Sequence, residues 1–167
     1  LEESFFPNGA IKTVAYRLSP ADLQETIDQV LYDPSFARAD ENLGDEIQLV
    51  GYKLDGRVEQ GGELTATVLW RILRDVPPTE RVIFVHLLDN NQIKWAQCDT
   101  TAFHASQWRA GDLVVGSYAL KVGDLVPPGR YSVVAGAYDY ESKARLPVRG
   151  SAAQRDAVAL GYLKVAG

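Results

Sequence analysis

The chain has 167 residues, of which 46% are hydrophobic and 23% are charged, and its formal net charge at pH 7 is −5. These totals are typical of one folded domain, or of one domain with an extension, and they exclude a disordered chain. No run approaches the roughly 20 apolar residues of a membrane span. No basic stripe indicates binding to nucleic acid.

The sequence begins at Leu1 and contains neither a methionine nor a signal-peptide pattern. We therefore expect a domain excised from a longer protein. The single cysteine, Cys98, excludes an internal disulfide. A lone cysteine is most often a small buried residue, and that is the role expected of Cys98.

Residues 1–46 carry three basic and ten acidic side chains, whereas residues 47–167 carry fourteen basic and twelve acidic ones. This difference predicts an N-terminal extension over residues 1–46, with a short strand within 11–18.

A helix is expected to start after Ser19, because serine can cap a helix and Pro20 suits its first position. Apolar residues then follow at helical spacing, at Leu23, Ile27, Val30 and Leu31. The helix is predicted to stop at Asp33-Pro34, and the next segment, SFARADENLGDE, reads as an acidic linker. The helix could pack against the domain or could dock onto a partner.

The pattern changes to that of strands from residue 47 onward. Residues 63–72 alternate strictly, which is typical of a half-buried strand, and residues 81–99 read as a hairpin with a turn at Asp89-Asn90-Asn91. Further strands are expected at 47–54, 113–121, 130–140, 144–148 and 157–165. About eight strands without intervening helices predict an all-β, antiparallel two-sheet sandwich over residues 47–167.

Several strand and turn motifs occur together in one order: LVGYKL (49–54), LTATVLWR (64–71), VIFVHLLD (82–89), SQWRAGDLVVGSYAL (106–120), PPGRYSVVAGAYD (127–139) and RLPV (145–148). This series resembles the soluble C-terminal β-sandwich module of bacterial multi-pass membrane proteins related to dolichyl-phosphate-mannose-type glycosyltransferases. The resemblance implies an immunoglobulin-like or jelly-roll sandwich on the extracytoplasmic side. It also implies an accessory role in contact with glycan or with the parent membrane protein, since the family's transferase chemistry lies in its membrane portion.

Motifs for catalysis and metal binding are absent from the sequence, which contains no nucleophile elbow and no phosphate- or dinucleotide-binding glycine loop. His86 and His104 lie too far apart for a zinc signature, and His86 is expected to be a core residue with a satisfied hydrogen bond. Asp99, Asp112 and Asp139 are the acids best placed for hydrolysis, but nothing in the sequence brings two of them together. We therefore expect no enzymatic activity, no metal and no cofactor.

Binding of carbohydrate is the most concrete function that the sequence offers. Sugar sites combine an aromatic ring with side chains that hydrogen-bond hydroxyl groups. The candidates are those in and near the polar loop 100–112 and at one strand end: Trp95, Gln97, His104, Gln107, Trp108, Arg109, Tyr138 and Asp139. The alternative is a structural or protein-interaction module, in which Trp95 lies on a sheet face and Trp108 anchors the loop.

Overall fold

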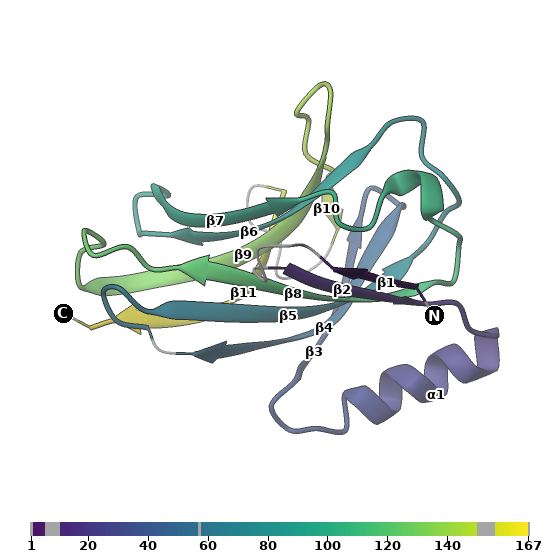
Figure 1. Ribbon diagram of the computed structural model, residues 1–167, viewed down its shortest axis with the longest axis horizontal. Coiled ribbons are helices and arrows are strands. Elements are labelled where there is room, and N and C mark those ends of the chain that lie inside the picture. Colours follow the sequence, from purple (N-terminus) through teal and green to yellow (C-terminus); the bar gives the residue numbers. More distant parts are fainter. Residues whose placement is uncertain (1, 6–10, 57, 150–155, 167) are drawn as a thin grey trace.

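The computed structural model describes residues 2–5, 11–56, 58–149 and 156–166, which form two antiparallel sheets packed face to face (Figure 1). The first sheet runs in the order β1 (Glu2–Phe5), β2 (Ile11–Tyr16), β8 (Leu113–Lys121), β5 (Glu63–Ile72), β4 (Ile47–Gly56), β3 (Ala37–Leu43) and β10 (Val148–Arg149). The second runs in the order β11 (Val158–Val165), β9 (Gly129–Asp139), β6 (Arg81–Leu88) and β7 (Lys94–Thr100). The predicted antiparallel sandwich is confirmed.

The main core fills the space between the sheets. Alternate residues of β5 and β9 point into it, as period-two strands require, and Trp70 of β5 has no solvent exposure. Its indole N–H donates a hydrogen bond to the hydroxyl of Tyr118 at 3.1 Å. Strand β6 is buried on both faces, which agrees with its central position between β9 and β7.

Helix α1 (Pro20–Val30) covers the outer face of the seven-stranded sheet (Figure 1). The Ser19 hydroxyl accepts a hydrogen bond from the backbone N–H of Asp22 at 3.3 Å, so Ser19 caps the helix as predicted. Leu23 and Ile27 are buried against a small apolar cluster that includes Val50 of β4. The helix therefore forms a third layer on the sandwich.

The predicted acidic linker is wrong, because most of that segment is strand β3, which pairs with β4. Its sequence, ARADENL, contains a single large apolar residue, Leu43, and its outward positions are polar. The strand nevertheless packs against the rest of the domain, because Leu43 is fully buried and Glu41 is nearly so. The first 46 residues thus contribute strands to the same sheet as β4, β5 and β8.

Candidate ligand-binding site

The outer face of the four-stranded sheet carries the candidate site. His86 of β6 pairs with Gln97 of β7 on one side and with Val134 of β9 on the other. Directly paired residues of antiparallel strands point to the same face. Since Val85 and Leu87 point into the core, His86 and its partners point away from it.

A chain of hydrogen bonds joins three strands on this face. The Nε2 atom of His86 lies 2.8 Å from Oδ1 of Asp99, and the Tyr138 hydroxyl donates to Oδ2 of the same carboxylate at 3.0 Å. Burial opposes ionisation of Asp99, but the contacts from His86 and Tyr138 outweigh it and hold the pKa of Asp99 below its usual range. Burial and the bond to Asp99 raise the pKa of Tyr138 to about 12. Asp99 is therefore an oriented carboxylate that is charged at neutral pH.

Phe84 lies on the same face and contacts both aromatic members of this network. The Phe84 ring stacks on the ring of His86 with a centroid distance of 4.5 Å, and its centroid lies 6.0 Å from that of Tyr138. The guanidinium of Arg145 lies over the same ring at 4.6 Å. Gly136 pairs with Phe84 and has no side chain, so the ring can lie against β9.

A cavity of about 180 Å³ opens beside His86. Small-molecule pockets usually span roughly 300–1,000 Å³, so this cavity suits one small polar unit. Its walls combine an apolar floor with amide and cationic groups, and the lining residues are His86, Leu88, Gln92, Lys94, Val134, Arg145 and Ala157.

Two of the predicted site residues, Tyr138 and Gln97, lie on this face, and a third, Trp95, lies on β7 but packs against the main core. Tyr138 belongs to the hydrogen-bond chain, and Gln97 is exposed in the same cross-strand row as His86. Trp95 is half-buried in β7, where its indole N–H donates to Oδ2 of Asp89 in the hairpin turn at 3.0 Å. Asp89 also accepts hydrogen bonds from the backbone of Asn91 and Ile93, so this segment is a turn, as expected.

Trp108 does not present a surface to a ligand. Its side chain is fully buried, and its indole N–H donates to the carbonyl of Phe103 at 3.2 Å. The loop predicted over residues 100–112 contains a short 3-10 helix, η1 (Ala105–Gln107), and Trp108 follows it directly. The alternative interpretation, in which Trp108 anchors this loop, describes the observed arrangement.

The remaining loop candidates point to other surroundings. His104 Nδ1 lies 3.0 Å from Oε2 of Glu80, and Arg109 donates to nearby backbone carbonyls, including that of Trp108. Gln107 is exposed within η1, and its backbone carbonyl accepts from Arg17. None of these contacts involves the His86 face.

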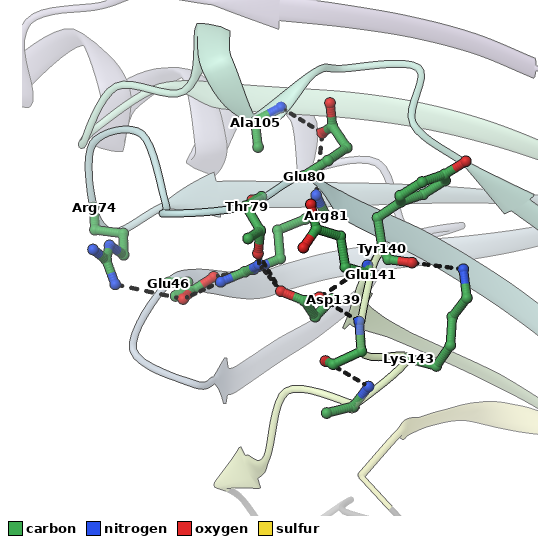
Figure 2. Close-up of polar contacts among 12 residues, drawn as sticks. Glu46, Arg74, Thr79, Glu80, Arg81, Ala105, Asp139, Tyr140, Glu141 and Lys143 are labelled. Carbon is green, nitrogen blue, oxygen red and sulfur yellow. Dashed lines mark hydrogen bonds and ion pairs between the residues drawn. The ribbon is translucent and has the colours of Figure 1, made fainter.

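Asp139 belongs to a buried ionic cluster at one end of the sandwich (Figure 2). Arg81 Nη1 donates to Asp139 Oδ2 at 2.8 Å, and the other side of the guanidinium binds Glu46. The hydroxyl of Thr79 also donates to Asp139, and this bond leads the contacts that hold the pKa of Asp139 far below its usual range. Asp139 is thus committed to contacts within the fold.

Sequence reasoning missed His86, Lys94 and Arg145 as site residues. The pairing of β6 with β7 puts His86 next to Gln97 and one row from Asp99. The alternation of residues along the predicted hairpin could therefore have placed His86 on the same face as these two residues. Arg145 had no such signal, because it comes from the connection after β9 and reaches Phe84 only in the folded chain.

Within the described ranges, no three histidine, cysteine or acidic side chains are grouped closely enough to hold a metal ion. Cys98 points into the core, and burial raises the pKa of its thiol to about 11. A thiol with so high a pKa is a poor nucleophile at neutral pH. Its role in the described structure is packing.

No helix in the part of the chain that the structure describes is long and apolar enough to cross a membrane. No protein-family model matches the sequence, and no curated protein does so. Among solved structures, the C-terminal domain of wzt superposes with a TM-score of 0.54 at 12% sequence identity, over 81% of this chain and 83% of that chain. At this identity the likeness shows that the chain shares the β-sandwich fold of that domain.

Proposed function

We propose that this chain is a non-catalytic accessory domain that binds carbohydrate on the outer face of the four-stranded sheet. The observation that carries the proposal is the cavity beside His86, whose ring is held in place by a hydrogen bond with the Asp99 carboxylate. A sugar hydroxyl is both a donor and an acceptor, so it is best bound by fixed groups of both kinds.

The polar groups around the cavity meet that requirement. The amide of Gln92, in the cavity lining, can both donate and accept a hydrogen bond. Lys94 donates from an exposed position on β7, and Arg145 donates from the connection after β9. Leu88 and Val134 supply apolar contact for the carbon face of a sugar ring.

The contacts of the other acids support a binding role over hydrolysis. Glycosidases need two carboxyl groups about 5 to 10 Å apart across a cleft. Asp112 is buried and pairs with Arg17 at 3.0 Å, while Asp139 pairs with Arg81. Neither contact lies in the cavity beside His86, whose lining contains no acid.

The proposed setting is a larger, membrane-associated protein with this domain on the extracytoplasmic side. Its support is the resemblance of the strand motifs to the C-terminal module of glycosyltransferase-related membrane proteins. The likeness to the C-terminal domain of wzt adds a second case in which such a sandwich is part of a longer chain.

A protein-interaction role is the second candidate, and one surface favours it. Tyr32, just past the end of α1, is 88% exposed. It lines a shallow hollow together with the side chains of Glu25, Asp28 and Gln29. An exposed aromatic residue beside acidic groups fits a basic partner surface.

Calorimetric titration with neutral and acidic oligosaccharides tests the carbohydrate proposal. Gln92→Ala removes an amide from the cavity lining, and Gln107→Ala removes an exposed amide on another part of the molecule. We expect a loss of affinity of about tenfold for Gln92→Ala, as removal of one good hydrogen bond predicts, and none for Gln107→Ala. Absence of binding at millimolar ligand, or an equal loss in both variants, would contradict the proposal.

A further inference from the structure

We propose that the ligand of this face is an acidic glycan, bound across two neighbouring cationic subsites. The inference rests on the proposed function, because it specifies the class of carbohydrate that the same face would take. Its first support is a second cavity, of about 370 Å³, lined by Gly129, Arg130, Tyr162, Leu163 and Lys164.

The strand register places the second cavity on the same face as the first. Tyr162 of β11 pairs with Ser132 of β9, which pairs with Leu88 of β6, and Leu88 pairs with Lys94 of β7. These four residues form one row across the sheet. The row that contains His86 lies two residues further along the strands, or roughly 7 Å away.

The two cavities are therefore close enough for one oligosaccharide to touch both. Two strand spacings separate Leu88 from Tyr162, which is roughly 10 Å. Tyr162 is 61% exposed and offers its ring to a sugar. The His86 cavity would hold one unit, and the Tyr162 cavity would hold a unit further along the same chain.

The charges select for an anionic ligand. All four charged residues that line the two cavities are basic: Lys94 and Arg145 in the first, Arg130 and Lys164 in the second. All four are exposed. Two other cavities of the described structure contain acids, namely Asp40 and Glu41 in one and Glu25 and Asp28 in the other.

This basic lining is opposite in sign to the net charge of the whole protein, which is −5. All of the excess of acid lies in the first 46 residues, and helix α1 among them covers the opposite face of the sandwich. Such a separation of charge orients an approaching anion toward the basic face.

Both arginines are held over aromatic rings. Arg130 lies 4.6 Å from the centroid of Tyr162, and Arg145 lies at the same distance from that of Phe84. A stacked guanidinium loses less freedom on binding, and its planar fork matches a carboxylate or a phosphate group. One such fork in each cavity provides two anion contacts along one glycan.

Oligogalacturonate and its methyl ester form a matched pair of probes, because they share a backbone and differ in charge. We expect the acidic form to bind at least about tenfold more tightly, since charge-assisted hydrogen bonds are roughly twice as strong as neutral ones. The preference should shrink between low and high salt, because salt screens exposed charges. Mannose 6-phosphate and inorganic phosphate, measured in parallel, separate recognition of phosphate from that of carboxylate.

Chain length distinguishes the two subsites. Arg145→Gln should weaken both the galacturonate monomer and the tetramer, whereas Arg130→Gln should weaken only the tetramer, each by about tenfold as loss of a charged hydrogen bond predicts. Arg109→Gln, an exposed arginine on another part of the molecule, is the matched control and should change neither affinity.

Three results would overturn the inference. Equal affinity for the acid and its methyl ester would refute the charge preference and leave the sugar site intact. Equal binding of polyglutamate, or an equal effect of Arg109→Gln, would mean unspecific attraction of polyanions. Absence of binding to any glycan would refute both this inference and the proposed function.

Discussion

Arg81 and Glu46 form a side-on ion pair in which Nε lies 2.8 Å from Oε2 and Nη2 lies 3.0 Å from Oε1. Both side chains are more than nine-tenths buried. Arg81 belongs to the four-stranded sheet, whereas Glu46 lies in the turn between β3 and β4 of the other sheet (Figure 2). The pair therefore joins the two layers at one end of the sandwich.

We predict that Arg81→Met lowers the free energy of unfolding by about 3–5 kcal/mol, because it leaves a buried carboxylate unpaired. The double variant Arg81→Met/Glu46→Leu should be less destabilised than the sum of the two single changes. Urea unfolding of the four proteins measures this coupling. Strictly additive losses would show that the two groups do not stabilise the fold as a pair.

Gly136→Ala should disturb the candidate site through Phe84. A methyl group at this position would overlap the Phe84 ring, which carries His86 on its face. We expect a loss of about 1–3 kcal/mol in stability, as for other overpacked cores, together with weaker glycan binding.

Gly123→Ala is the matched control for that change, because a methyl group there meets no atom within 4 Å. Its unfolding midpoint and glycan affinity should equal those of the parent protein. If Gly136→Ala behaves in the same way, the close contact between Phe84 and β9 does not constrain the site.

Trp108→Phe tests whether Trp108 anchors the loop over residues 100–112 or binds a ligand. Because the ring is buried and bonded to Phe103, the variant should lose stability, by about 1–3 kcal/mol for the smaller ring and the missing hydrogen bond. Glycan affinity, measured by calorimetry well below the unfolding temperature, should stay unchanged. A selective loss of glycan affinity with normal stability would show that Trp108 belongs to the binding site.

Acid should destabilise the fold through acids whose pKa is lowered in the folded state, Asp99 and Asp139 among them. Both have a pKa below the ordinary value in the folded state, so the unfolded chain binds their protons more readily. Their stabilising contribution is therefore complete above the unfolded value of about 3.9 and is lost as the pH falls below it toward the folded value. Urea unfolding from pH 7 to pH 2 should show this loss.

Asp139→Asn tests that assignment, since it removes one of the acids whose pKa is lowered in the folded state. The variant should be less stable than the parent at pH 7, and the slope of its stability against pH should be shallower below pH 4. A slope identical to that of the parent would show that Asp139 does not couple to folding.

The sequence predicted the strands that carry a clear alternation, and it located the hairpin of β6 and β7 with its turn. The reason is that burial of one strand face leaves a period of two in the residues themselves. Strand β3 lacked that signal, because its position near the sheet edge tolerates polar residues and only Leu43 marks the core. It forms a strand because it pairs with β4, and this contact exists only in the folded chain.

The candidate site was predicted in part. Tyr138 and Gln97 lie on the right face because strand alternation puts them there. Trp108 was wrongly included among the candidates. Composition shows that a tryptophan could stack on a ligand, but it does not show whether the ring points into the core. Arg145 and Arg130 could not be assigned from spacing, because each acts through an aromatic ring on another strand.

The pairing of β2 with β8 has a consequence for how the chain folds. Residues 11–16 pair with residues 113–118, which lie about a hundred positions later in the sequence. Closing so long a loop is slow, and it can happen only after β8 has been synthesised. Strand β2 should therefore join the sheet late during translation, and hydrogen exchange during refolding should find its amides among the last to gain protection.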